Sequence, residues 1–100
     1  MAKTEMTPTE IKASKFRLKA LERELIRCTP LMRGSIVTNG VRNKQPYFSV
    51  NKDKKTRLIY LGEKREPKAR EMSANYARLL EIIDEMTLIN MDLLKNDAAA

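Results

Sequence analysis

The stretch Leu31–Gly62, LMRGSIVTNGVRNKQPYFSVNKDKKTRLIYLG, decides the fold, because its pattern predicts the sheet of the protein. Residues 35–38 form a short β-branched segment. Residues 46–50 and 56–61 alternate in the manner of half-buried strands. We expect these two strands to pair, joined by the charged connection 51–55.

The first turn of the expected sheet is signalled by Asn39–Gly40, a dipeptide typical of two-residue hairpin turns. Whether Val41–Arg42 begins a returning strand is left open by the pattern. The sequence therefore predicts an antiparallel sheet of two or three strands.

Side chains of this sheet should alternate between its two faces. Phe48 and Val50 share one face, whereas Tyr47 and Ser49 share the other. One face can therefore pack on a helix, and the other can present Lys and Arg stems together with one or two Tyr rings.

The N-terminal flank predicts a helix over residues 7–28. Thr7 can cap the free amides, Pro8 suits the first helical position, and Glu10 can reach back to the Thr7 amide. Thr29–Pro30 ends the helix, because proline disfavours helical geometry in the residue before it. One helix face then carries Ile11, Ser14, Leu18, Leu21, Leu25 and Cys28.

The C-terminal flank predicts a longer helix over residues 67–95, opened by Pro67 after Gly62 ends the sheet. Its spacing of three and four residues is a coiled-coil signal, seen at Ala69, Met72, Tyr76, Leu79, Ile83, Met86, Asn90 and Leu93. Asn90 interrupts the apolar series. It either fixes the register of a partner helix or occupies an exposed position near the helix end.

These elements predict an α+β fold: an N-terminal helix, a two- or three-stranded antiparallel sheet, and a long C-terminal helix antiparallel to the first. We expect one domain over residues 7–95, flanked by disordered residues 1–6 and 96–100.

The partner of each helix is left open by the sequence. A basic first helix and an acidic second helix favour a hairpin within one chain, but the same charges permit pairing with another copy in a homodimer. The residues expected at a helix–helix or dimer interface are Leu18, Leu21, Leu25, Met72, Tyr76, Leu79, Ile83, Met86, Asn90 and Leu93.

Residue usage argues against an enzyme. The 100 residues contain no His and a single Cys28, so one chain offers neither a disulfide nor a Cys/His metal site. The carboxylates lie mostly at exposed helix positions, without a partnered nucleophile and base. We expect no catalytic site, metal or cofactor, and a cytoplasmic protein without a signal peptide or a membrane-spanning segment.

The net charge of +7 is unevenly distributed. Residues 1–41 hold eight basic and four acidic side chains, residues 42–70 hold ten and three, and residues 71–100 hold two and six. Charge concentrated on the sheet predicts a polyanionic partner. An anionic membrane is the weaker candidate, because neither helix joins a strongly basic face to Trp and Phe.

Cationic side chains interleaved with two tyrosines form the candidate nucleic-acid-binding site. Lysines and arginines would contact phosphates or base edges, and either tyrosine could stack or donate a hydrogen bond. The alternative is a lysine-rich sheet edge that only prevents aggregation. The site comprises Arg42, Lys44, Tyr47, Lys52, Lys54, Lys55, Arg57, Tyr60, Lys64 and Arg65.

The chain resembles a small uncharacterised prokaryotic and phage family encoded near transposases. The resemblance covers about residues 10–95 and rests on Leu31–Val37, Pro46–Phe48, Tyr60–Gly62, Asn75–Tyr76, Asn90 and Leu93–Leu94. Members of that family carry a Cys-rich, zinc-knuckle-like insert where this chain has residues 38–45, without Cys. The resemblance implies a role in mobile-element or phage DNA biology, without the metal.

The expected layout is also similar to the arm-binding domains of tyrosine recombinases. In those domains a three-stranded sheet followed by a helix places the sheet in the major groove. Residues 36–61 and the helix from Pro67 carry this similarity, which concerns fold layout and does not itself establish function.

The function predicted from the sequence is that of a non-enzymatic nucleic-acid-binding accessory protein of a mobile element or phage. DNA is expected more than RNA, with the basic sheet as the contact surface. The alternative is a protein-binding module, a phage or plasmid factor that docks on an acidic host protein and oligomerises through its helices.

Overall fold

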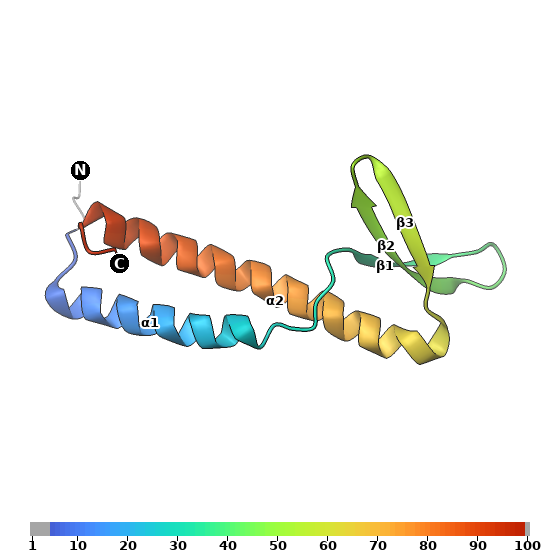
Figure 1. Ribbon diagram of the computed structural model, residues 1–100, viewed down its shortest axis with the longest axis horizontal. Helices are drawn as coiled ribbons and strands as arrows, with labels where there is room; N and C mark the ends of the chain where they lie inside the picture. The colour runs from blue at the N-terminus through green and yellow to red at the C-terminus, as the bar shows by residue number, and fades with distance from the viewer. Residues whose placement is uncertain (1–4, 100) are drawn as a thin grey trace. The chain divides into compact units, whose positions relative to one another are not determined.

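The fold is α+β, with an N-terminal helix, a three-stranded antiparallel sheet and a long C-terminal helix (Figure 1). The computed structural model describes residues 5–99, so the expected disorder of residues 1–4 and 100 lies outside the described residues. In chain order the elements are α1 (Pro8–Ile26), β1 (Ser35–Asn39), β2 (Gln45–Lys52), β3 (Lys55–Tyr60) and α2 (Gly62–Lys95).

Helix α1 begins with the capping box that the sequence predicts. The Thr7 hydroxyl accepts a hydrogen bond from the Glu10 amide at 3.1 Å, and the Glu10 carboxylate accepts one from the Thr7 amide at 2.8 Å. The helix ends at Ile26, two residues before the expected bound, because Arg27 already serves as the C-cap.

The sheet has the strand order β1-β2-β3, with both pairs antiparallel. Ser35–Asn39 is the third strand and pairs with the first half of β2, whereas Val41–Arg42, which the sequence left open as a returning strand, forms none. The expected two-residue turn at Asn39–Gly40 is wrong, because Asn39 pairs with Gln45 and residues 40–44 form a five-residue loop. Val41–Arg42 lies in that loop.

The tight turn of the sheet is Asp53–Lys54, between β2 and β3. Both residues have positive φ, 54° and 62°, as the two central residues of a type I′ hairpin turn require. The strands therefore extend further than the sequence predicts, and the charged connection shrinks from five residues to two.

Helix α2 begins at Gly62 and not at Pro67, which lies inside the helix. Gly62 has a φ of +63°, a left-handed conformation that lets the chain turn from β3 into the helix. The Arg65 amide then bonds the Leu61 carbonyl at 3.3 Å, so helical hydrogen bonding starts before the proline. Pro67 is the sixth residue of α2, beyond the amides that have no partner within a helix, so it removes one backbone hydrogen bond of the helix.

The described residues divide into two compact units. The helical unit contains α1 and the part of α2 from Leu79 onward, and the sheet unit is Cys28–Arg78.

The core of the sheet unit forms where one face of the sheet packs on the start of α2. Phe48, Leu61 and Ala69 are buried there, and Met32, Ile36 and Val50 pack around them. The segment before β1 is tied to α2 by a hydrogen bond from the Met32 amide to the Met72 carbonyl at 3.2 Å. In the sheet unit, the packed core therefore covers only one face of the sheet.

The core of the helical unit lies between α1 and α2, where Leu21, Ile82 and Leu93 are fully buried. Arg17 bonds Glu85 through Nε at 2.6 Å, and the Met6 amide bonds the Asn96 side chain at 3.0 Å. Earlier residues of α1 therefore lie beside later residues of α2, which confirms the antiparallel helices.

The buried stripe of α2 differs from the expected one at two positions. Ile82 is buried and Ile89 half-buried, whereas Ile83 and Asn90 are exposed. Of the two roles expected for Asn90, the exposed position is therefore the one observed within this chain. The stripe that faces α1 in the helical unit consists of Leu79, Ile82, Met86, Ile89 and Leu93.

Candidate nucleic-acid interface

The positive charge of the chain belongs to the sheet unit. Cys28–Arg78 carries twelve Lys and Arg residues against four Asp and Glu, whereas the helical unit carries eight against nine. The electrostatic field that would attract a polyanion therefore arises from the sheet unit.

The end of the β2–β3 hairpin is a free-standing two-stranded ribbon, here defined as Val50–Arg57. Strand β1 pairs with β2 only from Gln45 to Ser49, so beyond Ser49 the hairpin has no third strand. Residues 51–60 are all exposed. In Figure 1 the turn of this hairpin projects away from the start of α2.

Four cations of the sequence-predicted site lie on this ribbon. Lys52 and Lys55 are directly paired across the strands, and Arg57 follows on the same face, opposite Val50. Lys54 occupies the turn. Like charges placed directly opposite each other repel, so the Lys52–Lys55 pair is stabilised when an anion lies between or beside the two ammonium groups.

The other face of the ribbon carries no charge. Asn51 and Thr56 are paired across the strands, and the Thr56 hydroxyl donates a hydrogen bond to the Asn51 side-chain oxygen. Asn51 keeps its amide N–H groups as donors at the exposed surface. The ribbon therefore presents cations on one side and hydrogen-bonding groups on the other.

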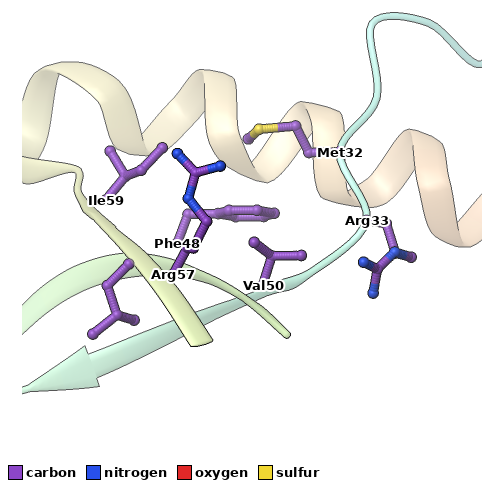
Figure 2. A pocket seen from close by; sticks show the side chains of 7 residues that line it. Met32, Arg33, Phe48, Val50, Arg57 and Ile59 are labelled. Atoms are coloured by element: carbon purple, nitrogen blue, oxygen red, sulfur yellow. The ribbon is translucent and has the colours of Figure 1, made fainter. Parts of the chain in front are cut away.

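A shallow pocket of about 290 Å³ adjoins the cationic side of the ribbon (Figure 2). In Figure 2, Arg57 lies between Ile59 and Phe48, and the Arg33 side chain points away from them. Arg33 donates a hydrogen bond to the Asn51 carbonyl at 3.2 Å. This bond places a fifth cationic side chain next to the four cations of the ribbon. Sequence reasoning did not include Arg33 in the site.

The remaining cations of the predicted site lie at the opposite end of the sheet. Arg42 and Lys44 are in the loop 40–44, and Lys64 and Arg65 are in the first turn of α2. The Leu61 amide bonds the Pro46 carbonyl at 3.0 Å, which places the start of α2 at the loop end of β2. The cations therefore form two groups, separated by the eight residues of β2 or about 26 Å at 3.3 Å per residue.

The two tyrosines form a pair of their own. Their rings meet edge to face with centroids 5.5 Å apart, and the Tyr60 hydroxyl donates to the Gln45 side chain at 3.1 Å. Tyr47 and Tyr60 are directly paired on the face opposite Phe48, while the strand cations Lys52, Lys55 and Arg57 share the Phe48 face. The expectation that the strand cations and the tyrosines project from one surface is therefore wrong.

None of the eight cations of the predicted site forms an ion pair with an acidic side chain of residues 5–99. By contrast, Lys68 pairs with Glu71, and Arg70 bonds Glu66 through Nε at 2.8 Å. Lys68 and Glu71 lie within the helix that the sequence predicts from Pro67, whereas the Glu66–Arg70 pair depends on the earlier start of α2 at Gly62.

Over residues 5–99, neither helix combines the length and the apolar composition needed to cross a lipid bilayer. Comparison of the chain with protein-family models, with curated proteins and with solved structures finds no match.

Proposed function

We propose that the protein binds duplex DNA by placing the ribbon Val50–Arg57 in the major groove. The observation that carries the proposal is the free-standing ribbon with unpaired cations on one face and the Asn51–Thr56 pair on the other. A two-stranded ribbon fits the major groove of B-form DNA, which is about 12 Å wide. Lysines and arginines then contact phosphates, while an Asn amide can bond a base edge.

The same geometry favours DNA over duplex RNA. The major groove of A-form RNA is deep and narrow, and side chains cannot enter it. Arg42, Lys44, Lys64 and Arg65, at the far end of β2, would contact phosphates beyond the groove that the ribbon occupies. This second set contributes affinity without sequence information.

The biological setting remains part of the proposal. A non-enzymatic, cytoplasmic accessory protein of a mobile element or phage is the role implied by the resemblance carried by Leu31–Val37, Pro46–Phe48 and Tyr60–Gly62. A basic DNA-binding ribbon is compatible with that role.

The test is a binding titration of the triple variant Lys54→Ala/Lys55→Ala/Arg57→Ala on duplex DNA across a salt series. Each lost phosphate contact lowers the salt slope by about 0.9, so we expect weaker binding and a slope reduced by roughly 2 to 3. Duplex RNA and single-stranded DNA probes, titrated in parallel, measure the preference for B-form duplex.

The matched control is Arg27→Ala/Lys68→Ala/Arg70→Ala, which removes the same formal charge. Lys68 and Arg70 are already paired with acidic side chains, and Arg27 lies at the end of α1 in the helical unit. The control should bind nearly as the unmodified chain does. Equal losses in both triple variants would show that net charge alone matters and would remove the ribbon from the interface.

A second candidate function rests on the pocket beside the ribbon. Its lining combines apolar side chains, among them Phe48, Val50 and Ile59, with the two arginines Arg33 and Arg57. Strand β3 is an exposed edge strand next to it. An extended peptide with acidic and apolar side chains could add to such an edge, as a docking host protein would. Failure to bind any nucleic acid at low salt would favour this function.

A further inference from the structure

A second apolar stripe runs along the helical-unit part of α2, separate from the one that packs on α1. Its members Leu80, Ile83, Thr87, Asn90 and Leu94 follow each other at spacings of three, four, three and four residues. This is the heptad spacing of a coiled-coil seam. The leucines and Ile83 in it are exposed, Ile83 at 45%.

The two stripes occupy different sides of one helix. Successive helical residues are about 100° apart, so the exposed stripe centres about 120° from the buried Ile82. A hollow of about 390 Å³ lies along it, lined by Ile83, Met86, Thr87, Asn90, Met91 and Leu94. No charged side chain lines this hollow.

On the side of α1, the exposed stripe is bordered by two lysines and one glutamate. A groove between the two helices is lined by Lys15, Leu18, Lys19, Glu22, Met86 and Asn90. Asn90 and Met86 belong to both hollows, so Lys15 and Lys19 stand next to the stripe. On the other side of the stripe, Asp84 lies one residue beyond Ile83, and Lys95 follows Leu94 on the same side about three turns later.

We propose that a second copy of this chain covers the exposed stripe, with α2 packed parallel to α2 of the partner around a two-fold axis along the helices. Such an axis exchanges the two borders of the stripe, so that Lys15 and Lys19 of each copy lie on the side of the partner's Asp84. An axis across the helices would place like charges opposite each other. The opposite charges of Lys19 and Asp84 therefore favour a second copy as the occupant and a parallel orientation.

The register within the chain gives this contact a specific pair. Because Arg17 lies beside Glu85, Lys19 stands near the level of Ile83 and Asp84. In a parallel arrangement the levels of the two copies coincide, so Lys19 of one copy faces the partner's Asp84. Asn90 faces its own counterpart, a buried polar pair that specifies register.

The first experiment measures the mass of the full chain in solution by light scattering or sedimentation. We expect a dimer for the unmodified chain and a monomer for Ile83→Glu, with unchanged helical circular dichroism, because Ile83 is not part of the α1 contact. The matched control is Leu88→Glu, which adds the same charge at a position 64% exposed and outside the stripe. This control should remain a dimer.

A charge swap tests the orientation. Asp84→Lys alone and Lys19→Glu alone should each weaken the dimer, and the double variant should restore it. A disulfide provides the geometric test: Asn90→Cys in a Cys28→Ala background should cross-link two copies, because parallel packing brings the two Cα atoms within the reach of a disulfide. Leu88→Cys in the same background should not.

Three results would overturn the proposal. If the unmodified chain is monomeric at every accessible concentration, no second copy covers the stripe. If Ile83→Glu is still a dimer, the exposed stripe is not the dimer interface. If Ile83→Glu is monomeric but Asn90→Cys never cross-links two copies, the helices do not pack in parallel. None of these results bears on DNA binding by the ribbon, which is measured separately.

Discussion

At the scale of single residues, Gly34 shows how closely the sheet unit is packed. A Cβ at this position would lie 2.4 Å from the Ser49 carbonyl oxygen and 2.6 Å from the Phe48 ring. The Phe48 ring belongs to the buried core of the sheet unit and the Ser49 oxygen to the backbone of β2, so neither neighbour moves without cost.

We therefore expect Gly34→Ala to reduce the free energy of unfolding by about 1 to 3 kcal/mol, the usual cost of overpacking. Denaturant unfolding followed by circular dichroism measures the change. Ser35→Ala, at the adjacent exposed position, is the control and should stay within about 0.5 kcal/mol of the unmodified chain. Equal stability of the two variants would mean that the backbone around Gly34 has room to relax.

At the scale of elements, the turn Asp53–Lys54 requires a left-handed conformation at both residues, which Asp53 adopts more readily than Lys54 does. For a residue with a Cβ, this conformation costs roughly 1 to 2 kcal/mol. The neighbouring Lys55 already belongs to β3.

Lys54 and Lys55 therefore allow a matched comparison, because they carry the same charge but one lies in the turn and the other in a strand. Lys54→Gly should raise the free energy of unfolding by up to about 1 kcal/mol, because glycine adopts a positive φ without strain. Lys55→Gly removes the same charge but should lower stability by roughly 0.5 to 1 kcal/mol, because glycine weakens a strand. Thermal or urea unfolding of both variants checks the signs. Two changes of the same sign would contradict the turn geometry.

The sequence predicts the elements well and their bounds less well, for identifiable reasons. The capping box at Thr7 and the alternation of Phe48 and Val50 are local signals, and both are confirmed. The early start of α2 depends on the φ of Gly62, which composition does not reveal. Asp53–Lys54 lacks the glycine that normally signals a tight turn.

The buried stripe of α2 was misassigned between Ile82 and Ile83 because two stripes overlap. One series with coiled-coil spacing contains Leu79, Ile82 and Met86, and a second contains Leu80, Ile83 and Thr87. Periodicity alone shows that both faces are apolar. Only the packing of α1 shows which of them is already occupied within the chain.

At the scale of the whole molecule, the concentration of charge in residues 42–70 was visible in the sequence, but its division between faces was not. Strand register decides that division, because a shift of one residue moves every side chain to the opposite face. Lys52 and Lys55 are paired with each other and not with a tyrosine, so cations and tyrosines separate.

The proposed DNA-binding ribbon lies in the sheet unit and the proposed dimer interface in the helical unit, so dimerisation should change the DNA affinity. A dimer carries two basic sheet units, so binding by one raises the effective concentration of the other near the same DNA. Ile83→Glu should therefore bind a long duplex more weakly than Leu88→Glu, although the two variants have equal charge. On a duplex too short for two copies, the difference should shrink.

The reciprocal measurement separates the two surfaces. The ribbon variant Lys54→Ala/Lys55→Ala/Arg57→Ala should lose DNA affinity but remain a dimer, because the ribbon and the exposed stripe of α2 belong to different units. DNA-binding titrations with short and long probes, together with the solution mass of each variant, give the DNA affinity and the oligomeric state of both variants. If Ile83→Glu is monomeric yet binds the long duplex as tightly as Leu88→Glu, the two sheet units act singly, and dimerisation serves a purpose other than DNA affinity.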